Sequence, residues 1–380
     1  MKLSSKLPDL GTTIFAVMSK MAADNDAINL SQGFPDFPID PNLIESVNQA
    51  MRSGLNQYPP MQGLPSLRTA IANKLSHTFA IEASPELEIT VTAGATQALY
   101  AAITALVHEG DDVIMFDPAY DSYDPVVRLN KATPVHIPLN KVDFSVDWDQ
   151  VEAKISPRTR CLITNSPHNP SGAVFSEQDM ARLEHILVKH DLLLISDEVY
   201  EHIIFDGNTH QSALKYPNLR SRSVAIFSFG KTFHATGWKI GYMVAPKEIT
   251  VELRKVHQFN VFTVNTPMQQ GIATYLEDPN HYEQLPDFYQ QKRDYFDNLM
   301  ADSRFTPVES HGTYFQLYSY ERIADKSDIE MANWLTVEHK VASIPCSVFY
   351  EKGKDIQYLR FCFAKKDSTL QTAAQRLCKI

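Results

Sequence analysis

Two residues of this sequence, Lys231 and Asp197, follow strand-like apolar runs and could take part in chemistry there. Burial near other cations would lower the pKa of the Lys231 amine and let it form an imine with an aldehyde. A carboxylate at Asp197 would be costly to bury without a cationic partner, and a protonated pyridine nitrogen is such a partner. Each residue alone also has an ordinary explanation, since most lysines are solvated and an aspartate can cap a helix. Together they raise the hypothesis of a site for an aldehyde cofactor that contains a pyridine ring.

Small and polar residues follow the other apolar runs of the chain as well. In open α/β sheets, ligands bind beyond the carboxyl ends of the strands, so we expect these residues at one rim. The turn Gly94-Ala95-Thr96 opens a helix whose free N–H groups suit a phosphate, although a plain tight turn is the simpler explanation. The rim also has an aromatic residue, an asparagine, a tyrosine and a serine: Tyr120, Asn169, Tyr200 and Ser228. This is the combination that a pyridoxal phosphate site needs.

The tripeptide Gly230-Lys231-Thr232 also resembles the end of a phosphate-binding P-loop. That motif requires another glycine five positions before its second glycine. Position 225 is an alanine inside an apolar run. The sequence therefore argues against an ATP-binding protein of this class.

The rim residues need a scaffold that brings the ends of several strands together. The strand-like runs are Glu88–Thr92, Val113–Phe116, Cys161–Thr164, Leu192–Ser196 and Val224–Phe229. Amphipathic helices are predicted between them, for example over Pro65–Thr78 and over Ser176–His190, where Ser176 and Asp179 form an N-cap pair. This alternation predicts an α/β fold with a mainly parallel sheet covered by helices on both faces.

The alternation fades near residue 275. A long amphipathic stretch follows over Phe288–Met300, and short strands are expected around Tyr314–Tyr318 and Tyr358–Ala364. We therefore predict three parts. Residues 1–40 form an N-terminal segment that joins the small domain, residues 41–275 form the large cofactor-binding domain, and residues 276–380 form the small α+β domain.

The composition argues against several classes of protein. The 380 residues include 35 Lys and Arg against 45 Asp and Glu, and the net charge of −10 does not favour a nucleic-acid partner. The four cysteines form no C-x-x-C pair, so neither a metal site nor a disulfide scaffold is expected. The chain starts without the apolar run of a signal peptide, and its most apolar stretch, residues 98–107, is too short to span a membrane. We expect a cytoplasmic protein without a membrane partner.

Six segments, in the same order along the chain, resemble the class I aminotransferases that use pyridoxal phosphate. They are SQGFPDFP (31–38), NQYPPMQGLPSLR (56–68), SPHNPSG (166–172), SDEVYEH (196–202), SFGKTFHATGWKIGY (228–242) and YLRFCFA (358–364). The set is most similar to the branch that contains kynurenine (glutamine) aminotransferases and bacterial methionine aminotransferases. The resemblance implies aminotransferase fold type I, with a mainly parallel seven-stranded sheet in the large domain and a small α+β domain built from both chain ends.

The resemblance implies how the rim residues bind the cofactor. Lys231 forms the imine and, once the substrate has released it, moves the proton between the substrate Cα and the cofactor. Asp197 pairs with the pyridine nitrogen, while Tyr200 and Asn169 hydrogen-bond the ring oxygen. Tyr120 stacks on the ring. The residues implied at the phosphate are Gly94, Ala95, Thr96, Ser228 and Lys239, where aspartate-type relatives have an arginine at the last position.

The resemblance also implies a binding site for the substrate carboxylate. Arg360 matches an arginine that clamps this group, because a planar guanidinium donates two parallel hydrogen bonds; an ordinary strand arginine is the alternative. Gly33 would let the backbone approach the same carboxylate, unless it is a simple turn glycine before Pro35. Asn169 is expected to contact the substrate as well as the cofactor.

The expected side-chain pocket is apolar. Residues 260–265 lack the arginine with which aspartate-type relatives bind a second carboxylate. The aromatic residues that could build the pocket are Phe15, Tyr58, Tyr120 and Phe262, although core or interface packing would explain them too. We therefore expect ping-pong transfer from a neutral bulky or aromatic L-amino acid, such as methionine, phenylalanine, leucine or a kynurenine-like compound, to a 2-oxo acid.

Tyr58 resembles a tyrosine that reaches the phosphate of the neighbouring subunit, which implies a homodimer with sites at the interface. Two other functions remain open. A cysteine-conjugate or cystathionine β-lyase would use the same cofactor, because the same carbanion can expel a leaving group. A non-catalytic pyridoxal-domain regulator would need a DNA-binding module, for which the residues before Ser31 are too few.

Overall fold

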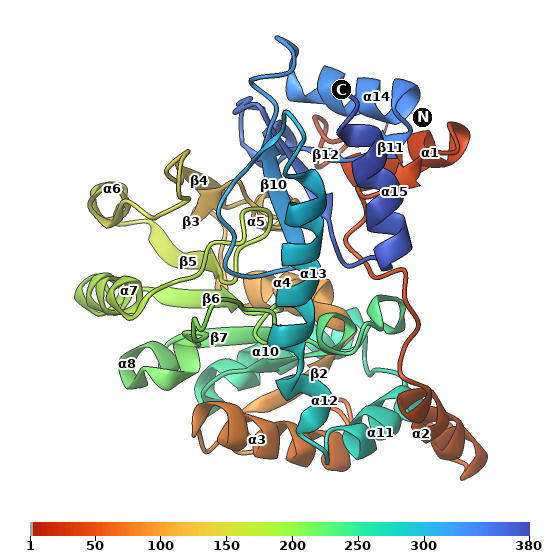
Figure 1. Ribbon diagram of the computed structural model, residues 1–380. Helices are drawn as coiled ribbons and strands as arrows, with labels where there is room; N and C mark the ends of the chain where they lie inside the picture. Colours follow the sequence, from red (N-terminus) through yellow and green to blue (C-terminus); the bar gives the residue numbers. More distant parts are fainter. Residues whose placement is uncertain (1–2) are drawn as a thin grey trace.

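The structure, a computed structural model, describes residues 3–380 and contains a large sheet with helices around it (Figure 1). Seven strands form this sheet in the order β2-β8-β7-β6-β5-β3-β4. Their bounds are β2 Ile89–Thr92, β3 Asp112–Asp117, β4 Thr133–Pro138, β5 Thr159–Asn165, β6 Leu193–Asp197, β7 Ser223–Ser228 and β8 Gly241–Val244. Only β8 is antiparallel to its neighbours. The predicted α/β fold with a mainly parallel sheet is confirmed.

The five strands predicted for the large domain are present, and their ends lie within two residues of the expected ones. The run 224–229 is strand only to Ser228, because Phe229 begins the one-turn helix α9 (Phe229–Thr232). The sequence analysis missed β4 and β8. β4 contains prolines at positions 134 and 138. An edge strand tolerates proline because its outer N–H groups need no partner. β8 has only four residues, too few for a clear period.

Helices cover both faces of the sheet. Successive residues of β3 alternate between two apolar cores, as the period of a strand requires. Val113 and Met115 pack in the core with α4 (Gly94–Leu106), whereas Ile114 packs in the core with α7 (Glu177–Lys189). Because both faces are buried, substrate access is left to the strand ends.

The helices begin and end close to the predicted positions. The N-cap pair of α7 is confirmed: Ser176 Oγ accepts a hydrogen bond from the Asp179 N–H, and the Asp179 carboxylate accepts one from the Ser176 N–H. The remaining helices of the first 283 residues are α1 Ile14–Asp24, α2 Pro41–Arg52, α3 Pro65–Phe79, α5 Tyr123–Leu129, α6 Trp148–Ala153, α8 Pro217–Arg220, α10 Lys247–Asn260, α11 Thr266–Tyr275 and α12 Asn280–Glu283. Within residues 3–380, no helix has the length and apolarity needed to cross a membrane.

The two ends of the chain meet in a second, smaller group of elements. A four-stranded antiparallel sheet has the order β12-β13-β10-β9, and β1 pairs in parallel with β11. These strands are β1 Ile28–Asn29, β9 Thr306–Pro307, β10 Phe315–Ser319, β11 Val341–Ala342, β12 Ile344–Pro345 and β13 Tyr358–Cys362. The helices α13 Leu285–Met300, α14 Asp328–Glu338 and α15 Asp367–Leu377 lie around them, and both termini lie nearby (Figure 1). The domain boundaries at residues 40 and 275 stay a prediction.

The register of the large sheet brings the predicted rim residues together. Asn165, the last residue of β5, pairs with Asp197, the last residue of β6. Ser228 at the end of β7 and Thr92 at the end of β2 both pair with Gly241 of β8. The carboxyl ends of β2, β5, β6 and β7 therefore lie along one edge, as expected of an α/β sheet.

Candidate active site

A cavity of about 300 Å³ opens at this edge of the sheet. All but two of the residues predicted for the site line it. They are Phe15, Gly33, Gly94, Ala95, Thr96, Tyr120, Asn169, Asp197, Tyr200, Ser228, Lys231, Lys239 and Arg360. Since these residues come from both chain ends and from the large sheet, the cavity lies where the two groups of elements meet.

The other two predicted residues, Tyr58 and Phe262, lie outside this cavity. Their rings form an edge-to-face pair with centroids 5.4 Å apart. Tyr58 is 82% exposed and Phe262 is 49% exposed. Within one chain, neither residue reaches the site, so a role in catalysis would require a second copy of the chain.

The Lys231 amine lies inside the cavity on α9, directly after β7. Its Nζ donates a hydrogen bond to Tyr314 Oη at 2.8 Å and lies 3.5 Å from the Gly33 carbonyl oxygen. Burial lowers the pKa of this amine to about 8, and repulsion from Arg360 acts in the same direction. A substantial fraction of the amine is therefore neutral near pH 8, as a nucleophile or a base must be.

Asp197 is a buried carboxylate, only 4% exposed. Its Oδ2 accepts a hydrogen bond from Tyr123 Oη at 2.6 Å, and its Oδ1 accepts a weaker one from the Val199 N–H at 3.4 Å. Burial raises the pKa of Asp197 to about 6, although the hydrogen bond from Tyr123 acts to lower it. Asp197 forms no salt bridge with any residue from 3 to 380, so a cationic ligand would supply the counter-charge that this carboxylate lacks.

We expect Asp197→Asn to stabilise the cofactor-free protein at pH 8. The pKa of this carboxyl is about 6 when folded, against an ordinary value of 3.8, so the folded state binds the proton more tightly than the unfolded state. The contribution of Asp197 to stability therefore falls as pH rises from about 4 to 6, by about 3 kcal/mol in total. Asparagine has no charge to bury, so its variant should be more stable by about that amount above pH 6.

Urea unfolding of both cofactor-free proteins between pH 4.5 and pH 8 measures this effect. Asp302→Asn, at an exposed carboxyl, is the matched control. It should not become more stable than the natural chain between pH 4.5 and pH 8. A stability difference between natural chain and Asp197→Asn that is the same at pH 4.5 and pH 8 would contradict the raised pKa.

Arg360 is a buried arginine on β13, only 1% exposed. One guanidinium nitrogen donates to Asn169 Oδ1 at 2.9 Å and the other to the Ser31 carbonyl at 3.0 Å, whereas Nε has no partner within residues 3–380. The guanidinium carbon lies 3.9 Å from the ring centroid of Phe315. Both of its named hydrogen-bond acceptors are neutral, and no carboxylate of residues 3–380 forms a salt bridge with it, so this buried cation suits a carboxylate ligand.

The start of α4 also lines the cavity. Gly94 has a φ of +75°, the N-cap residue Ala93 has no side chain that could cap the helix, and Gln97 Oε1 accepts only the Ala93 N–H, at 3.2 Å. The first N–H groups of the helix are therefore available to an anion. The Lys239 amine lies close by, since a Cβ on Gly94 would be 3.3 Å from Lys239 Nζ. Ser228 lines the cavity as well.

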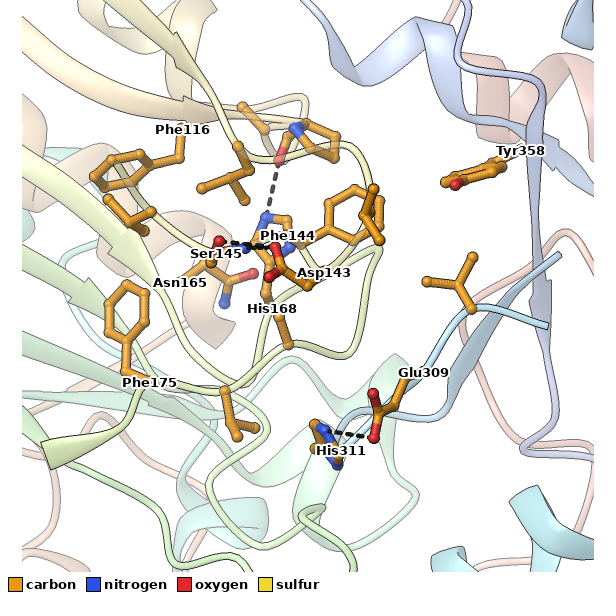
Figure 2. Close-up of a pocket in the computed structure, with 18 of the residues that line it drawn as sticks. Phe116, Asp143, Phe144, Ser145, Asn165, His168, Phe175, Glu309, His311 and Tyr358 are labelled. Carbon is orange, nitrogen blue, oxygen red and sulfur yellow. Dashed lines mark hydrogen bonds and ion pairs between the residues drawn. The ribbon is translucent and has the colours of Figure 1, made fainter. Parts of the chain in front are cut away.

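A second and larger cavity, of about 480 Å³, adjoins the first and shares Tyr120 and Asn165 with it. Figure 2 shows its aromatic residues around His168, and the pair of Glu309 and His311 at its other side. Among the described residues that line it there is no lysine or arginine. An anionic ligand therefore finds its counter-charges in the smaller cavity, where Lys231, Lys239 and Arg360 lie.

Three hydrogen-bond partners of Asp197 and Lys231 were not predicted. Tyr123 donates to Asp197, Asn165 Nδ2 donates to the Asp197 carbonyl at 3.0 Å, and Tyr314 contacts Lys231. Asn165 could have been found, because it directly follows an apolar run. Tyr123 and Tyr314 are 74 and 83 residues from their partners in the sequence, and no spacing signals such contacts.

The chemistry of the cavity fits pyridoxal phosphate. The first N–H groups of α4, beside Lys239, suit its phosphate, and Asp197 lacks the cation that a protonated pyridine nitrogen would supply. Lys231 offers an amine to its aldehyde. As for metals, no group of three or more His, Cys, Asp or Glu residues within 3–380 is arranged to hold an ion.

Comparisons with known proteins agree with this chemistry. The sequence profile "Aminotransferase class I and II" matches residues 25–377. A methionine aminotransferase of Escherichia coli is 50% identical over 374 residues, which are 98% of this chain and 97% of that one. Kynurenine–oxoglutarate transaminase 3 of Homo sapiens is 33% identical over 403 residues, 98% of this chain and 89% of that one.

Solved structures are similar over the whole chain. The structure reported for the Escherichia coli methionine aminotransferase has a TM-score of 0.98 at 50% identity and covers 100% of both chains. The N-succinyldiaminopimelate aminotransferase of Mycobacterium tuberculosis has a TM-score of 0.96 at 36% identity, again covering 100% of both chains.

Proposed function

The chain belongs to the class I and II aminotransferases, and from this premise we propose the roles of its residues and the amino acids that it uses. The reaction moves an amino group from an amino acid to a 2-oxo acid, and the cofactor is pyridoxal phosphate. When bound, this cofactor supplies an electron sink for the negative charge that develops at the substrate Cα.

We propose that the residues lining the cavity hold the cofactor. The helix start at Gly94-Ala95-Thr96, with Ser228 and Lys239, binds its phosphate. Asp197 holds the proton on its ring nitrogen, and the hydrogen bond from Tyr123 keeps this carboxylate oriented. Tyr200 and Asn169 bind the ring oxygen, and Tyr120 packs on the ring face.

Lys231 performs the proton transfer in this proposal. It takes the proton from the substrate Cα as a neutral amine and returns it to the other carbon as an ammonium, so one group acts first as base and then as acid. A pKa of about 8 suits both steps, since neither form is strongly disfavoured near neutral pH.

Arg360 binds the substrate α-carboxylate in this proposal. Its contacts with Asn169 and with the Ser31 carbonyl fix the guanidinium before substrate arrives, which lowers the cost of ordering it. Gly33 lies at the same side of the cavity. The backbone there can approach the carboxylate closely because Gly33 has no side chain.

We further propose a preference for neutral bulky donors, above all methionine and aromatic amino acids. One observation supports it: Arg360 is the only arginine among the described residues that line the cavity, and aromatic rings surround it. The rings of Phe15 and Phe349 lie 5.3 and 5.5 Å from its guanidinium carbon. A second, side-chain carboxylate would therefore be placed against apolar groups without a partner. The relatives that are named for methionine and kynurenine point the same way.

A panel of amino donors with several 2-oxo acids tests this preference. We expect kcat/KM for methionine and phenylalanine to exceed that for aspartate by at least about 100-fold, because an unpaired buried carboxylate costs several kcal/mol. Aspartate equal to methionine would contradict the proposal. N-succinyldiaminopimelate belongs in the panel, since one relative is named for it. Release of ammonia from cystathionine without a 2-oxo acid would indicate the β-lyase instead.

We also propose a homodimer in which Tyr58 reaches the cofactor phosphate of the neighbouring subunit. Tyr58 and Phe262 are large aromatic side chains that one chain leaves exposed, and such groups often mark an interface. Tyr58→Ala should weaken cofactor binding by about 10- to 100-fold, the usual loss for a hydrogen bond to a charged group.

Mixed dimers test whether Tyr58 acts across the interface. Coexpression of Lys231→Ala with Tyr58→Ala should create one intact site per mixed dimer, which joins Lys231 of one subunit with Tyr58 of the other. That site should bind the cofactor as tightly as the natural enzyme does. If Tyr58 serves its own chain, no mixed dimer regains an intact site.

Two further features belong to this proposal. We place the enzyme in the cytoplasm, where reduced thiols like its four free cysteines are usual. We also keep the division into a large domain of residues 41–275 and a small domain of residues 1–40 and 276–380. The pairing of β1 with β11 supports it, since it joins the first forty residues to the C-terminal part.

A further inference from the structure

The proposed function makes no use of the contact between Tyr314 and Lys231. Tyr314 lies directly before β10 and is fully buried. Its Oη lies 2.8 Å from Lys231 Nζ and 2.6 Å from the carbonyl oxygen of Gly33. Three distant parts of the chain therefore meet at the catalytic amine.

The direction of each hydrogen bond follows from the groups involved. A carbonyl can only accept, so the bond to Gly33 uses the single proton of the Tyr314 hydroxyl. Burial raises the pKa of Tyr314 well above its ordinary value of 10, so the hydroxyl keeps this proton. The Tyr314 oxygen then offers only lone pairs to its other neighbour, and an N–H of Lys231 donates to it.

This arrangement decides what remains free on the amine. A neutral amine has two N–H bonds and one lone pair, and only the lone pair can accept a proton from substrate. A tyrosine that donated to Lys231 would occupy that lone pair. We propose that the Gly33 carbonyl takes the Tyr314 proton and thereby leaves the Lys231 lone pair free, which makes Tyr314 a positioning residue for the catalytic amine. The inference rests on the proposed role of Lys231 as the base.

Neighbouring side chains hold Gly33, Lys231 and Tyr314 in place. The Tyr314 ring meets the Tyr200 ring edge-on, with centroids 5.3 Å apart and planes at 88°. A Cβ on Gly33 would lie 2.7 Å from Phe315 Cζ, so with a larger residue either the Phe315 ring or the backbone at position 33 would have to shift. Gly33 therefore has a packing role in addition to the substrate-binding role that the resemblance to aminotransferases implies.

The chain offers a matched control for the Tyr314 hydroxyl. Tyr289 is also fully buried, and its ring lies 5.8 Å from that of Tyr314. Its hydroxyl has no hydrogen-bond partner among residues 3–380. Tyr314→Phe and Tyr289→Phe therefore remove the same atom from neighbouring rings, but only the first removes a contact with Lys231.

The first test uses cofactor-free protein and does not depend on activity. Competitive labelling with acetic anhydride at several pH values, read by mass spectrometry, measures the pKa of the Lys231 amine. Tyr314→Phe should lower this pKa by about 0.5 to 1 unit, because an accepting oxygen stabilises the ammonium more than the amine. Tyr289→Phe should leave it unchanged. 3-Fluorotyrosine at position 314 keeps the ring shape and weakens the hydroxyl oxygen as an acceptor, so it should also lower the pKa of Lys231. This variant provides the test if Tyr314→Phe does not fold.

The second test uses the loaded enzyme in a single half-reaction with methionine and with methionine deuterated at Cα. Tyr314→Phe should slow proton transfer by about 10-fold, the effect of one lost hydrogen bond, and raise the deuterium isotope effect while KM changes little. Tyr289→Phe should match the natural enzyme. If Tyr314→Phe leaves either the labelling pKa or the isotope effect unchanged, the inference is overturned. If instead the natural enzyme fails to transaminate, the proposed function fails, and the labelling result still decides the contact of Tyr314 with Lys231.

Discussion

Lys231→Ala is expected to lower kcat/KM for methionine by about 10⁴-fold. The amine is the group proposed to take and return the substrate proton, and general acid–base groups contribute up to about this factor. Its burial and its pKa of about 8 prepare it for that role, and alanine can neither bond to an aldehyde nor move a proton. Borohydride should therefore no longer fix the cofactor covalently to the protein.

The measurement combines steady-state kinetics with mass spectrometry of the borohydride-treated protein. Lys255→Ala, at an exposed lysine of α10, is the control and should behave as the natural enzyme. Cofactor should still bind to Lys231→Ala without a covalent bond, because the residues at its phosphate and ring nitrogen are unchanged. Activity within 10-fold of the natural enzyme would show that another group performs the proton transfer.

The second large effect concerns the substrate carboxylate. Arg360→Ala should lower kcat/KM for amino acids by about 30- to 5000-fold, since removal of one partner of a buried charge pair costs about 2–5 kcal/mol. Arg360→Lys keeps the positive charge but lacks the planar fork, so its loss should lie between those of the natural enzyme and the alanine variant. In Arg360→Ala, Asn169 Oδ1 would also lose the N–H that it accepts from Arg360.

Cofactor affinity separates this role from general damage to the site. Both Arg360 variants should bind the cofactor within a few-fold of the natural enzyme, because its proposed ligands lie at other positions. Arg52→Lys, at the exposed end of α2, controls for the exchange of residue type. If amino acids bind to Arg360→Ala as well as to the natural enzyme, Arg360 does not bind the carboxylate.

The sequence alone was enough to predict the α/β fold and the edge at which the site lies. Short apolar runs alternate with amphipathic helices, and such a pattern has one common solution, a mainly parallel sheet with helices on both faces. In that solution the residues after each strand must lie along one edge, whatever the rest of the fold does. Asp197 ends its strand, and Lys231 and Asn169 come within four residues of the ends of theirs, so their meeting was predictable. Strands β4 and β8 were missed because proline and short length hide the period of two.

Only the tertiary structure decided which groups touch the reacting side chains. The hydrogen bond of Tyr123 to Asp197 and that of Tyr314 to Lys231 join segments 74 and 83 residues apart. Local periodicity specifies which face of an element is buried, but a hydrogen bond between two buried side chains depends on how whole elements dock. The Tyr314 hydroxyl donates to a third segment, at the Gly33 carbonyl, and no sequence pattern near residue 314 or 231 predicts this hydrogen bond. The sequence was therefore enough to predict the catalytic lysine. Which hydrogen bonds its amine makes, and so whether its lone pair is free, depends on the packing of three distant segments.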